Sequence, residues 1–523
     1  MEQEKSQLHI GIILSYINML VGNLIPLLYT PVMLQLLGKK EYGLYKLSST
    51  VTSYLTLISL GIGSAVVRYL IDAKIHDGEQ GERRVFGLFM IIFRVIAIVT
   101  LIVGIWLTFN IQIWYGRSLD ADQLFRMRIL IFIMVCNTAL NFSLSPYISV
   151  VNAHERFIFL QIMNIISTCF GPILNLIMLF LGYASIGIAV STLVLGMVVN
   201  ISYLIYVRRS MKIRPIYKDI SFPLLKDILK FSFWIFVANV VSQLFNATDT
   251  AMIGAIPKLA TEGVAVYNIG ATFNSIMFSL TTGISSVMAP KVNGMVLSGK
   301  SGKELTDLSI KVGRLQCYIM MLVITGFIVF GKPFIYYYAG KGFEESYWIA
   351  ILMMIPNMIP LAQSVCLSVV VAQNKHKFRS IVYLIIAIIN VIGTWFLMKI
   401  MGVVGAALMT GIALILGQGF AMNWFYKVKS GIEVEHFWIE VGKTFIIPIM
   451  MCILFIVISN YIDFYNLKLF FTGVMIYTCV YILLLWKFVL NNYEKNLILK
   501  PLGRIYYKFN RRKIYNGGKY EER

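Results

Sequence analysis

The chain has 523 residues, of which 58% are apolar and only 14% are charged, and its formal net charge is +21 at pH 7. Soluble domains average about 45–50% apolar and about 25% charged residues, so this composition excludes an ordinary soluble protein. The basic excess does not require a nucleic-acid partner, and we expect none, because Lys and Arg in loops also orient membrane proteins.

Windows of mostly apolar residues, long enough to cross a bilayer, recur along nearly the whole chain. A helix needs about 20 such residues to cross a hydrocarbon core of about 30 Å. The apolar runs are continuous and do not alternate as barrel strands do, so we predict an all-α polytopic membrane protein. The fourteen predicted spans are 10–37, 46–72, 85–109, 124–151, 157–181, 186–207, 231–255, 263–297, 312–338, 347–372, 380–398, 403–426, 438–460 and 469–486.

The loops between these spans carry Lys and Arg very unevenly. With the N-terminus inside, the inner loops and tails hold 30 of them and the outer loops hold 7. Basic loops stay in the cytoplasm, so we predict a multi-pass protein of the cell membrane with both termini cytoplasmic. Because basic and aromatic residues near a membrane bind anionic lipid, we expect the C-terminal tail to contact membrane lipids, with a protein partner as the alternative.

The two halves of the chain resemble each other. "LYKLSSTVTSYLTLISLGIGSAVVRYL" and "VYNIGATFNSIMFSLTTGISSVMAPKV" align at a constant offset of 222, and "VVNAHERF" resembles "VVAQNKHKF". Transporters are commonly built from related halves with the substrate site between them. We therefore predict two pseudo-symmetric six-helix lobes plus two C-terminal helices. The predicted parts are an N-lobe at 1–207, a basic cytoplasmic linker at 208–230, a C-lobe at 231–427, the last two spans at 428–490 and a basic cytoplasmic tail at 491–523.

Polar side chains recur at helical spacing along three spans. In the seventh span Asn239, Gln243, Asn246 and Asp249 follow one another at steps of four, three and three, which places them on one helix face. The eighth span carries a similar stripe from Asn268, and the second span carries another. Such stripes either line a wet cavity or hold packed helices together. Their matched places in the two halves favour the cavity.

Basic residues inside membrane spans are costly and are therefore candidates for function, although those near span ends reach the interface cheaply. Arg94 lies deepest, while Arg68 and Lys291 fall within one position of each other under the offset of 222. These three are candidates for binding an anion at the inward mouth, with snorkelling as the alternative. We expect the other six, near span ends, to be solvated or to snorkel to the interface: Lys46, Arg126, Arg128, Arg314, Lys332 and Lys443.

Asp249 is the only acidic residue well inside a predicted span. Coupled transporters need a group that exchanges a cation or a proton between states, and a buried carboxylate suits this role. We therefore predict that Asp249 binds a coupling ion, with Asn390 in the eleventh span as a further ligand. The alternative is a structural role, such as an ion pair with Lys258.

The stretch "LLYTPVMLQLLGKKEYGLYKLSSTVTSYLTLISLGIGSAVVRYL" resembles the N-terminal pattern of Wzx-type polysaccharide flippases. These form a branch of the multidrug/oligosaccharidyl-lipid/polysaccharide exporter (MOP) superfamily, together with MATE transporters and lipid II flippases. In the family, a proline-containing end of the first span precedes an "LG…YGLY" turn, and the second span closes on "lGigsA…Ry". The likeness covers roughly Leu8 to Leu70, and "DTAMIG" in the seventh span adds to it.

The resemblance implies a V-shaped pair of lobes whose central cavity opens alternately to the two sides of a bacterial cytoplasmic membrane. The implied cargo is a glycan on an undecaprenyl diphosphate carrier, moved from the inner to the outer leaflet for cell-surface polysaccharide synthesis. A polysaccharide polymerase or another assembly protein is an implied partner. A coupling proton or sodium ion is the implied energy source, and no other cofactor, metal or catalytic residue is expected.

The resemblance also suggests where the diphosphate binds. A lipid II flippase of the superfamily uses arginines of its first, second and eighth spans, which matches Arg68 and Lys291 here, whereas the first span of this chain has Asn18 and Asn23 but no arginine. The predicted substrate-binding residues are Arg68, Arg94, Lys291, Asn23, Asn239, Gln243, Asn246 and Asn268. The predicted coupling-ion residues are Asp249 and Asn390.

Three other functions compete with a flippase. A MATE-like antiporter of small molecules or cations has the same fold, although such antiporters usually have twelve spans. A membrane polysaccharide polymerase or glycosyltransferase generally needs a large outer loop, and the longest here, 110–123, has about fourteen residues. A scaffold in an assembly complex is compatible with the same sequence. We favour a non-enzymatic flippase.

Overall fold

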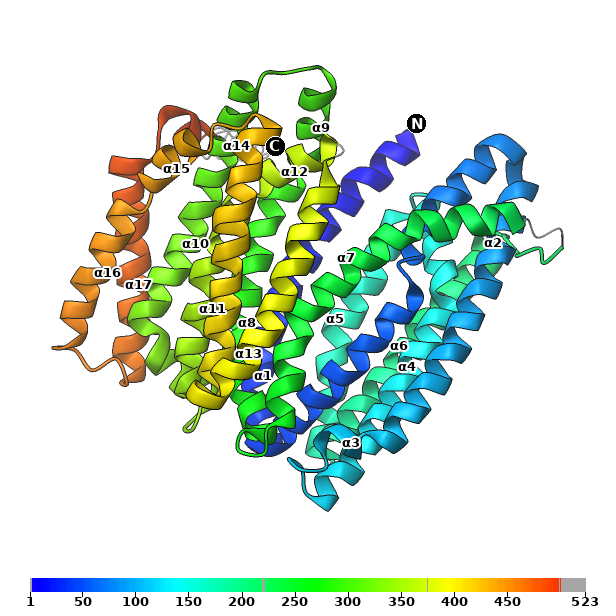
Figure 1. Cartoon of the computed structure of the whole chain (residues 1–523), viewed down its shortest axis with the longest axis horizontal. Coiled ribbons are helices and arrows are strands. Elements are labelled where there is room, and N and C mark those ends of the chain that lie inside the picture. The colour runs from blue at the N-terminus through cyan, green and yellow to red at the C-terminus, as the bar shows by residue number, and fades with distance from the viewer. Residues whose placement is uncertain (1, 219–221, 374, 498, 500–523) are drawn as a thin grey trace, which may run out of the picture. The chain divides into compact units, whose positions relative to one another are not determined.

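A computed structural model describes residues 2–218, 222–373, 375–497 and 499, and every secondary-structure element among them is a helix (Figure 1). The elements are α1 (Glu2–Ser53), η1 (Tyr54–Ser59), α2 (Gly63–Asn110), α3 (Gln112–Tyr115), α4 (Ala121–Ala153), α5 (Phe157–Phe180), α6 (Ala184–Ile205), η2 (Tyr206–Ser210), α7 (Phe222–Ala255), α8 (Ala260–Ser286), α9 (Ala289–Leu297), α10 (Gly302–Ala339), α11 (Glu345–Ala362), α12 (Ser364–Ala372), α13 (His376–Leu414), η3 (Ile415–Met422), α14 (Asn423–Ser430), α15 (Val434–Gly442), α16 (Ile446–Ser459), α17 (Leu467–Leu484) and η4 (Leu485–Val489). The all-α prediction is confirmed.

The predicted spans coincide with these helices apart from short breaks, but helices and spans do not correspond one to one. In the described residues, ten helices are long and apolar enough to cross a membrane, or eleven if the bent pair α15 and α16 counts as one span. The number is below fourteen partly because Gly38, Gly78 and Gly402 turn the chain inside α1, α2 and α13, at φ values of 74°, 67° and 62°. Glycine adopts this left-handed conformation without a steric penalty. The count of fourteen spans stays a prediction.

The predicted second span, 46–72, is interrupted in its middle. After α1 the chain forms the 3₁₀ turn η1, and Leu60 and Gly61 then take φ values of 51° and 70° before α2 begins. A Cβ on Gly61 would lie 3.0 Å from the backbone nitrogen of Phe236 in α7, so only glycine permits this close packing. Irregular backbone at membrane depth is tolerated where protein buries it or water reaches it. Here α7 covers it.

By spatial contact, the chain divides into two compact units. The first comprises Met1–Ile276, Ile335–Met353 and Lys377–Gly417, and the second comprises Met277–Phe334, Met354–His376 and Gln418–Arg523. The predicted boundaries of lobes, linker and tail stay predictions. Residues 219–221 of the predicted linker and residues 498 and 500–523 of the predicted tail lie outside the described residues.

Each unit has its own apolar core. In the first unit, α2 and α4 pack along each other and α6 packs on α4 (Figure 1), around fully buried aromatic rings such as Phe86, Phe89 and Tyr147. In the second unit, α10, α16 and α17 surround a cluster that includes Phe330 and Tyr477. Apolar burial and close packing between helices therefore define both units.

The first part of the predicted linker lies against α2. The Ile216 N–H donates to the Arg83 carbonyl at 2.9 Å, and Arg83 Nη2 donates to the Lys212 carbonyl at 3.3 Å. Gly87 makes room for this segment, because a Cβ there would lie 1.9 Å from the Ile216 carbonyl oxygen. The last part of the predicted linker, from Phe222, continues directly into α7 as helix.

A buried ion pair ties the C-terminal end of the second unit to α10. Arg314 is 8% exposed and Glu494 is 2% exposed, and Arg314 Nε and Nη2 donate to the two Glu494 oxygens at 2.7 Å and 3.2 Å. Tyr318 donates to the same carboxylate at 3.0 Å, and Arg314 also donates to the Glu440 and Val489 carbonyls. The expectation that Arg314 is solvated is therefore wrong, because a carboxylate 180 residues later in the chain neutralises it.

Candidate functional site

The side chains of the polar stripe predicted along α7 lie in three different environments within the first unit. Gln243 donates to Ser53 at the end of α1, and Thr248 shares a hydrogen bond of 3.0 Å with Tyr54 in η1. Asn246 is exposed and donates to Ser242 on its own helix, and Asn239 is also exposed. Asp249 is buried. The stripe therefore packs against the interrupted second span, remains accessible in part, and ends in a buried carboxylate.

Asp249 is 1% exposed and is held by hydroxyl groups from two other helices. Its Oδ2 accepts hydrogen bonds from Tyr267 of α8 at 2.6 Å and from Thr410 of α13 at 2.7 Å. Its Oδ1 accepts from Thr394 of α13 at 3.4 Å. No ion pair of Asp249 with Lys258 or another cation occurs among the described residues, so its structural partners are neutral.

Asn390 completes this cluster, as the sequence suggested. It is fully buried, its Oδ1 lies 3.3 Å and 3.4 Å from the hydroxyls of Thr410 and Thr394, and its Nδ2 has no hydrogen-bond partner among the described residues. Each hydroxyl donates only one hydrogen, and both are already directed to Asp249. The oxygens of Asp249 and Asn390 therefore share the same two hydroxyls, and oxygen ligands of this kind are the type that a proton or a cation with a preference for oxygen uses.

Three residues of this cluster were missed by sequence reasoning: Tyr267, Thr394 and Thr410. Thr394 lies four residues after Asn390, on the same helix face, which is a signal that the sequence does contain. Tyr267 aligns with Tyr45 under the 222 offset, but the alignment gives no indication of a carboxylate partner. Thr410 comes from beyond the Gly402 turn of α13, and only the fold brings it to Asp249.

The candidate cations of the first unit contact aromatic side chains. Arg68 in α2 is exposed, and its guanidinium carbon lies 4.8 Å from the ring centre of Phe231 in α7. Arg94 is also exposed, donates to the Tyr217 hydroxyl at 3.2 Å and lies over that ring. No carboxylate forms an ion pair with either arginine among the described residues. Both guanidinium groups therefore keep hydrogen-bond donors available for an anion.

The remaining candidates are exposed or form hydrogen bonds within their own helices. Lys291 is exposed on α9, in the second unit, where Val287 and Met288 separate α9 from α8. Asn23 of α1 donates to the Met19 carbonyl at 2.7 Å, and Asn268 of α8 donates to the Val264 carbonyl at 2.9 Å. Asn268 also reaches the Thr250 hydroxyl at 3.4 Å, beside Asp249.

The "LGKKEYG" turn around Gly38 joins segments from both predicted lobes within the first unit. Lys39 donates to the Gly342 carbonyl at 2.7 Å and lies 3.7 Å from Glu262, both in the predicted C-lobe. Glu41 accepts a hydrogen bond from Ser185 and lies 3.6 Å from Arg126, both in the predicted N-lobe. This turn, at the predicted outer end, therefore holds the two sets of helices together.

Gly43 lets the same turn approach the first turn of α8 closely. A Cβ added to Gly43 would lie 1.8 Å from the Thr261 carbonyl oxygen, which belongs to the backbone and has little freedom to move away. The preceding residue, Tyr42, is 1% exposed. The "YG" of the turn thus combines a buried ring with a position where only glycine fits.

The comparisons with known proteins agree with this architecture. The chain is similar to a solved structure of the lipid II flippase MurJ in its inward closed conformation, with 16% identity and a TM-score of 0.73 over 94% of this chain and 99% of that one. It is also similar to an inward-facing MATE multidrug transporter of the MOP superfamily (12% identity, TM-score 0.62, 82% of this chain and 98% of that one). A third similar structure is the MATE transporter VcmN of Vibrio cholerae (15% identity, TM-score 0.57, 83% of this chain and 100% of that one).

At these identities the solved structures establish the fold. The comparison with curated proteins gave no match. A family model described as "Polysaccharide biosynthesis protein" matches residues 10–292, more than half of the chain. The chain is a multi-pass membrane protein that belongs to this polysaccharide biosynthesis family.

Proposed function

We propose that this protein is a flippase that moves an undecaprenyl-diphosphate-linked oligosaccharide from the inner to the outer leaflet of a bacterial cytoplasmic membrane. The observation that carries the proposal is the combination of its family with a fold that follows the lipid II flippase over 94% of the chain. Its transport is non-covalent and needs no catalytic residue. The moved glycan then serves cell-surface polysaccharide synthesis by a polymerase or assembly partner.

The exposed cations suit the charged part of this cargo. A diphosphate requires positive partners, and arginine donates in the bidentate geometry that phosphate oxygens accept. In the proposed mechanism, Arg68, Arg94 and Lys291 attract the diphosphate at the inward mouth. The exposed amides of Asn239 and Asn246, with Gln243, Asn268 and Asn23, bind the sugar, and the polyprenyl tail stays in lipid.

The buried carboxylate suits the coupling role. A charged Asp249 in a site lined only by neutral groups is costly unless a proton or cation neutralises it. In the proposed mechanism, Asp249 binds the coupling ion with Asn390, Thr394 and Thr410 in one conformation and releases it in another. Thr248 and Gln243, on the same helix as Asp249, form hydrogen bonds with Tyr54 and Ser53 in the interrupted second span. A shift of α7 on ion binding would therefore also move these contacts.

A MATE-like antiporter of organic cations is the second candidate, and the likeness to MATE transporters favours it. Proteoliposomes distinguish the two functions. For a flippase, added lipid-linked oligosaccharide becomes accessible in the opposite leaflet to a membrane-impermeant lectin, and a cationic dye is not moved. Dye movement without leaflet exchange of the glycolipid would identify the antiporter instead.

Removing the candidate diphosphate cations is expected to abolish export. Losing one partner of a desolvated hydrogen-bonded charge pair costs about 2–5 kcal/mol, so Arg68→Ala with Lys291→Ala should slow leaflet exchange at least about 30-fold. Membrane abundance should stay unchanged, because both side chains are exposed. Lys399→Ala, which removes an exposed cation at the opposite predicted end, is the matched control. Normal exchange by the double variant would refute the assignment.

Gly43→Ala is expected to open the outer end. The added methyl group overlaps the Thr261 carbonyl, and relief of such an overlap costs about 1–3 kcal/mol, which changes the ratio of two states about 5- to 150-fold. In a cysteine-free background carrying Asn246→Cys, an impermeant thiol reagent added outside should label the variant correspondingly faster. Gly22→Ala, also in α1 but with nothing within 4 Å of its added Cβ, should label like the parent. Equal labelling of all three would contradict a closing role for the turn.

A further inference from the structure

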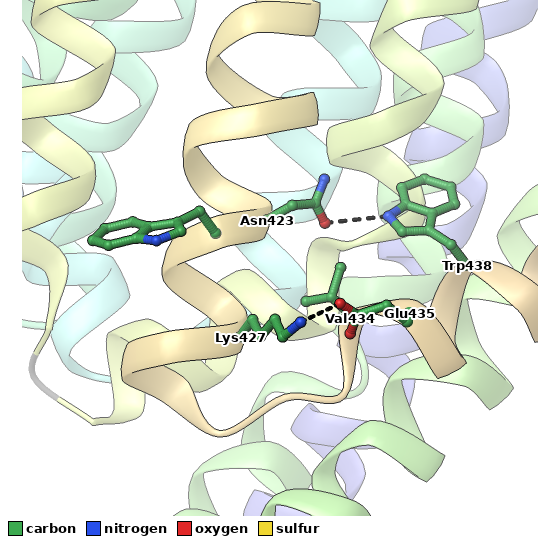
Figure 2. Close-up of a pocket in the computed structure, with 6 residues that line it drawn as sticks. Asn423, Lys427, Val434, Glu435 and Trp438 are labelled. Atoms are coloured by element: carbon green, nitrogen blue, oxygen red, sulfur yellow. Dashed lines mark hydrogen bonds and ion pairs between the residues drawn. The ribbon is translucent and has the colours of Figure 1, made fainter.

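A groove of about 360 Å³ lies between α14 and α15 in the second unit (Figure 2). Its volume is within the range of about 300–1,000 Å³ that is usual for small-ligand sites. Figure 2 shows the Lys427 and Glu435 side chains meeting across the groove and the Trp438 indole directed to Asn423. Trp424 from α14 and Val434 from α15 complete the lining.

The Asn423 side chain, in the wall of this groove, has all its hydrogen-bonding positions occupied. Asn423 Nδ2 donates to the Gln418 and Gly419 carbonyls of η3, and its Oδ1 accepts from Gln363 and from Trp438 Nε1, the latter at 3.2 Å. These contacts use both hydrogens and both lone pairs of the amide. The groove is therefore built by fixed partners, and Asn423 has no group left to offer a ligand.

The groove lies between the ends of two helical runs that are apolar and long enough to cross a membrane. The helical run Phe378–Ser430 is a candidate membrane span, and the bent pair Val434–Gly442 and Ile446–Ser459 follows it in the chain. Between them the chain turns at Gly431, which has a φ of 71°. Tryptophan is enriched at this level of membrane proteins, where its ring sits among lipid headgroups. Loop charges assign this end of the helices to the cytoplasm.

The charges at the groove are balanced, unlike those of the chain. Residues 427–443 contain three lysines and three glutamates, in a protein with a net charge of +21. The Lys427 and Glu435 side chains form an ion pair and are 59% and 63% exposed. Lys427 keeps further N–H donors and Glu435 keeps further acceptor positions, so the pair offers one cationic and one anionic contact side by side.

This charge pattern selects among lipid headgroups. A zwitterion with a phosphate and a primary ammonium complements Lys427 and Glu435 together. An anionic phosphoglycerol headgroup would meet Lys427 but would be repelled by Glu435. A choline headgroup has a quaternary ammonium and cannot donate a hydrogen bond to Glu435.

We propose that the groove between α14 and α15 binds a membrane phospholipid with a phosphoethanolamine headgroup, with the phosphate on Lys427, the ammonium on Glu435 and the indoles against the glycerol and upper acyl chains. This lipid is a resident of the inner leaflet and is distinct from the transported cargo. Its binding does not depend on the proposed flippase activity.

Tryptophan quenching tests this site in the full-length protein. Of the eight tryptophans, only Trp424 and Trp438 are kept and the other six are changed to Phe. The protein is placed in phosphatidylcholine nanodiscs that contain equal small fractions of phosphatidylethanolamine, phosphatidylglycerol or phosphatidylcholine with brominated chains. Brominated phosphatidylethanolamine is expected to bind about two- to fivefold better than the other two, the range that an exposed charge pair supports.

Charge-removing variants separate lipid recognition from general stability. Lys427→Gln with Glu435→Gln should abolish the preference, whereas Lys427→Arg with Glu435→Asp should keep it. The matched control is Lys300→Gln with Glu304→Gln, another exposed Lys–Glu pair that is 49% and 44% exposed, which should quench like the parent. Equal quenching by the three lipids in the parent, or an unchanged preference in the Gln pair, would overturn the proposal. Leaflet exchange is measured separately, so failure here leaves the flippase proposal standing.

Discussion

Asp249→Asn is expected to leave a protein that still equilibrates its cargo between leaflets but no longer responds to an ion gradient. A tenfold cation ratio supplies 1.36 kcal/mol per ion exchanged. In vesicles with the membrane potential held at zero, the parent should therefore reach up to about a tenfold excess of glycolipid in one leaflet for each coupled ion. The variant should approach equal amounts, because Asn has no charge for the ion to neutralise.

The substitution removes the charge with little change of shape, because Asn is close to Asp in size. Its Oδ1 can still accept hydrogen bonds from Tyr267 and Thr410, and its Nδ2 can donate to the Thr394 hydroxyl. Asp463→Asn is the matched control, since it removes an exposed carboxylate from the loop before α17. Testing proton and sodium gradients separately identifies the coupling ion. A gradient response in Asp249→Asn equal to that of the parent would exclude Asp249 from coupling.

Arg314→Ala is expected to destabilise the second unit by about 3–5 kcal/mol, because it leaves the Glu494 carboxylate buried without its cation. The lost backbone contacts of Arg314 add to this effect. Arg314 also donates hydrogen bonds to the Glu440 and Val489 carbonyls, so α15 and η4 lose a shared partner. The measurement is the thermal unfolding of purified protein, together with the amount of protein retained in the membrane.

Two variants serve as controls for this prediction. Lys443→Ala breaks the exposed pair with Glu440, in which the lysine side chain is 57% exposed, and should cost no more than about 1 kcal/mol. Arg314→Met combined with Glu494→Leu replaces both charges by apolar groups and should recover much of the stability. If Arg314→Ala unfolds like Lys443→Ala, the buried pair contributes little.

The sequence was sufficient for the helical class and for the approximate positions of the spans, because continuous apolar runs of about 20 residues have few alternatives in a membrane. It was insufficient for the helix boundaries. The turns at Gly38, Gly78 and Gly402 and the break after Ser53 depend on backbone conformations that hydropathy does not report. Gly61 looks like a packing residue in the sequence, but its close approach to Phe236 becomes visible only when α7 is in place.

The candidate site was predictable where helical spacing was enough and not elsewhere. Asp249 and Asn390 stand out as polar residues in apolar spans, and the structure brings them into one cluster through Thr394 and Thr410. Arg94 was a candidate for binding an anion because of its depth in the span. Its hydrogen bond to Tyr217 of the linker could not be predicted, because the path of the linker along α2 cannot be inferred from composition. Roles for the cations in binding cargo stay predictions.

The long separation between Arg314 and Glu494 has a consequence for biosynthesis. The two residues are 180 positions apart, and chains are synthesised at about 5–20 residues per second. Arg314 therefore leaves the ribosome about 10–40 s before its carboxylate partner exists. During that interval α10 must enter the membrane with an uncompensated cation near its predicted inner end, and the second unit acquires its final stability only when Glu494 has been made.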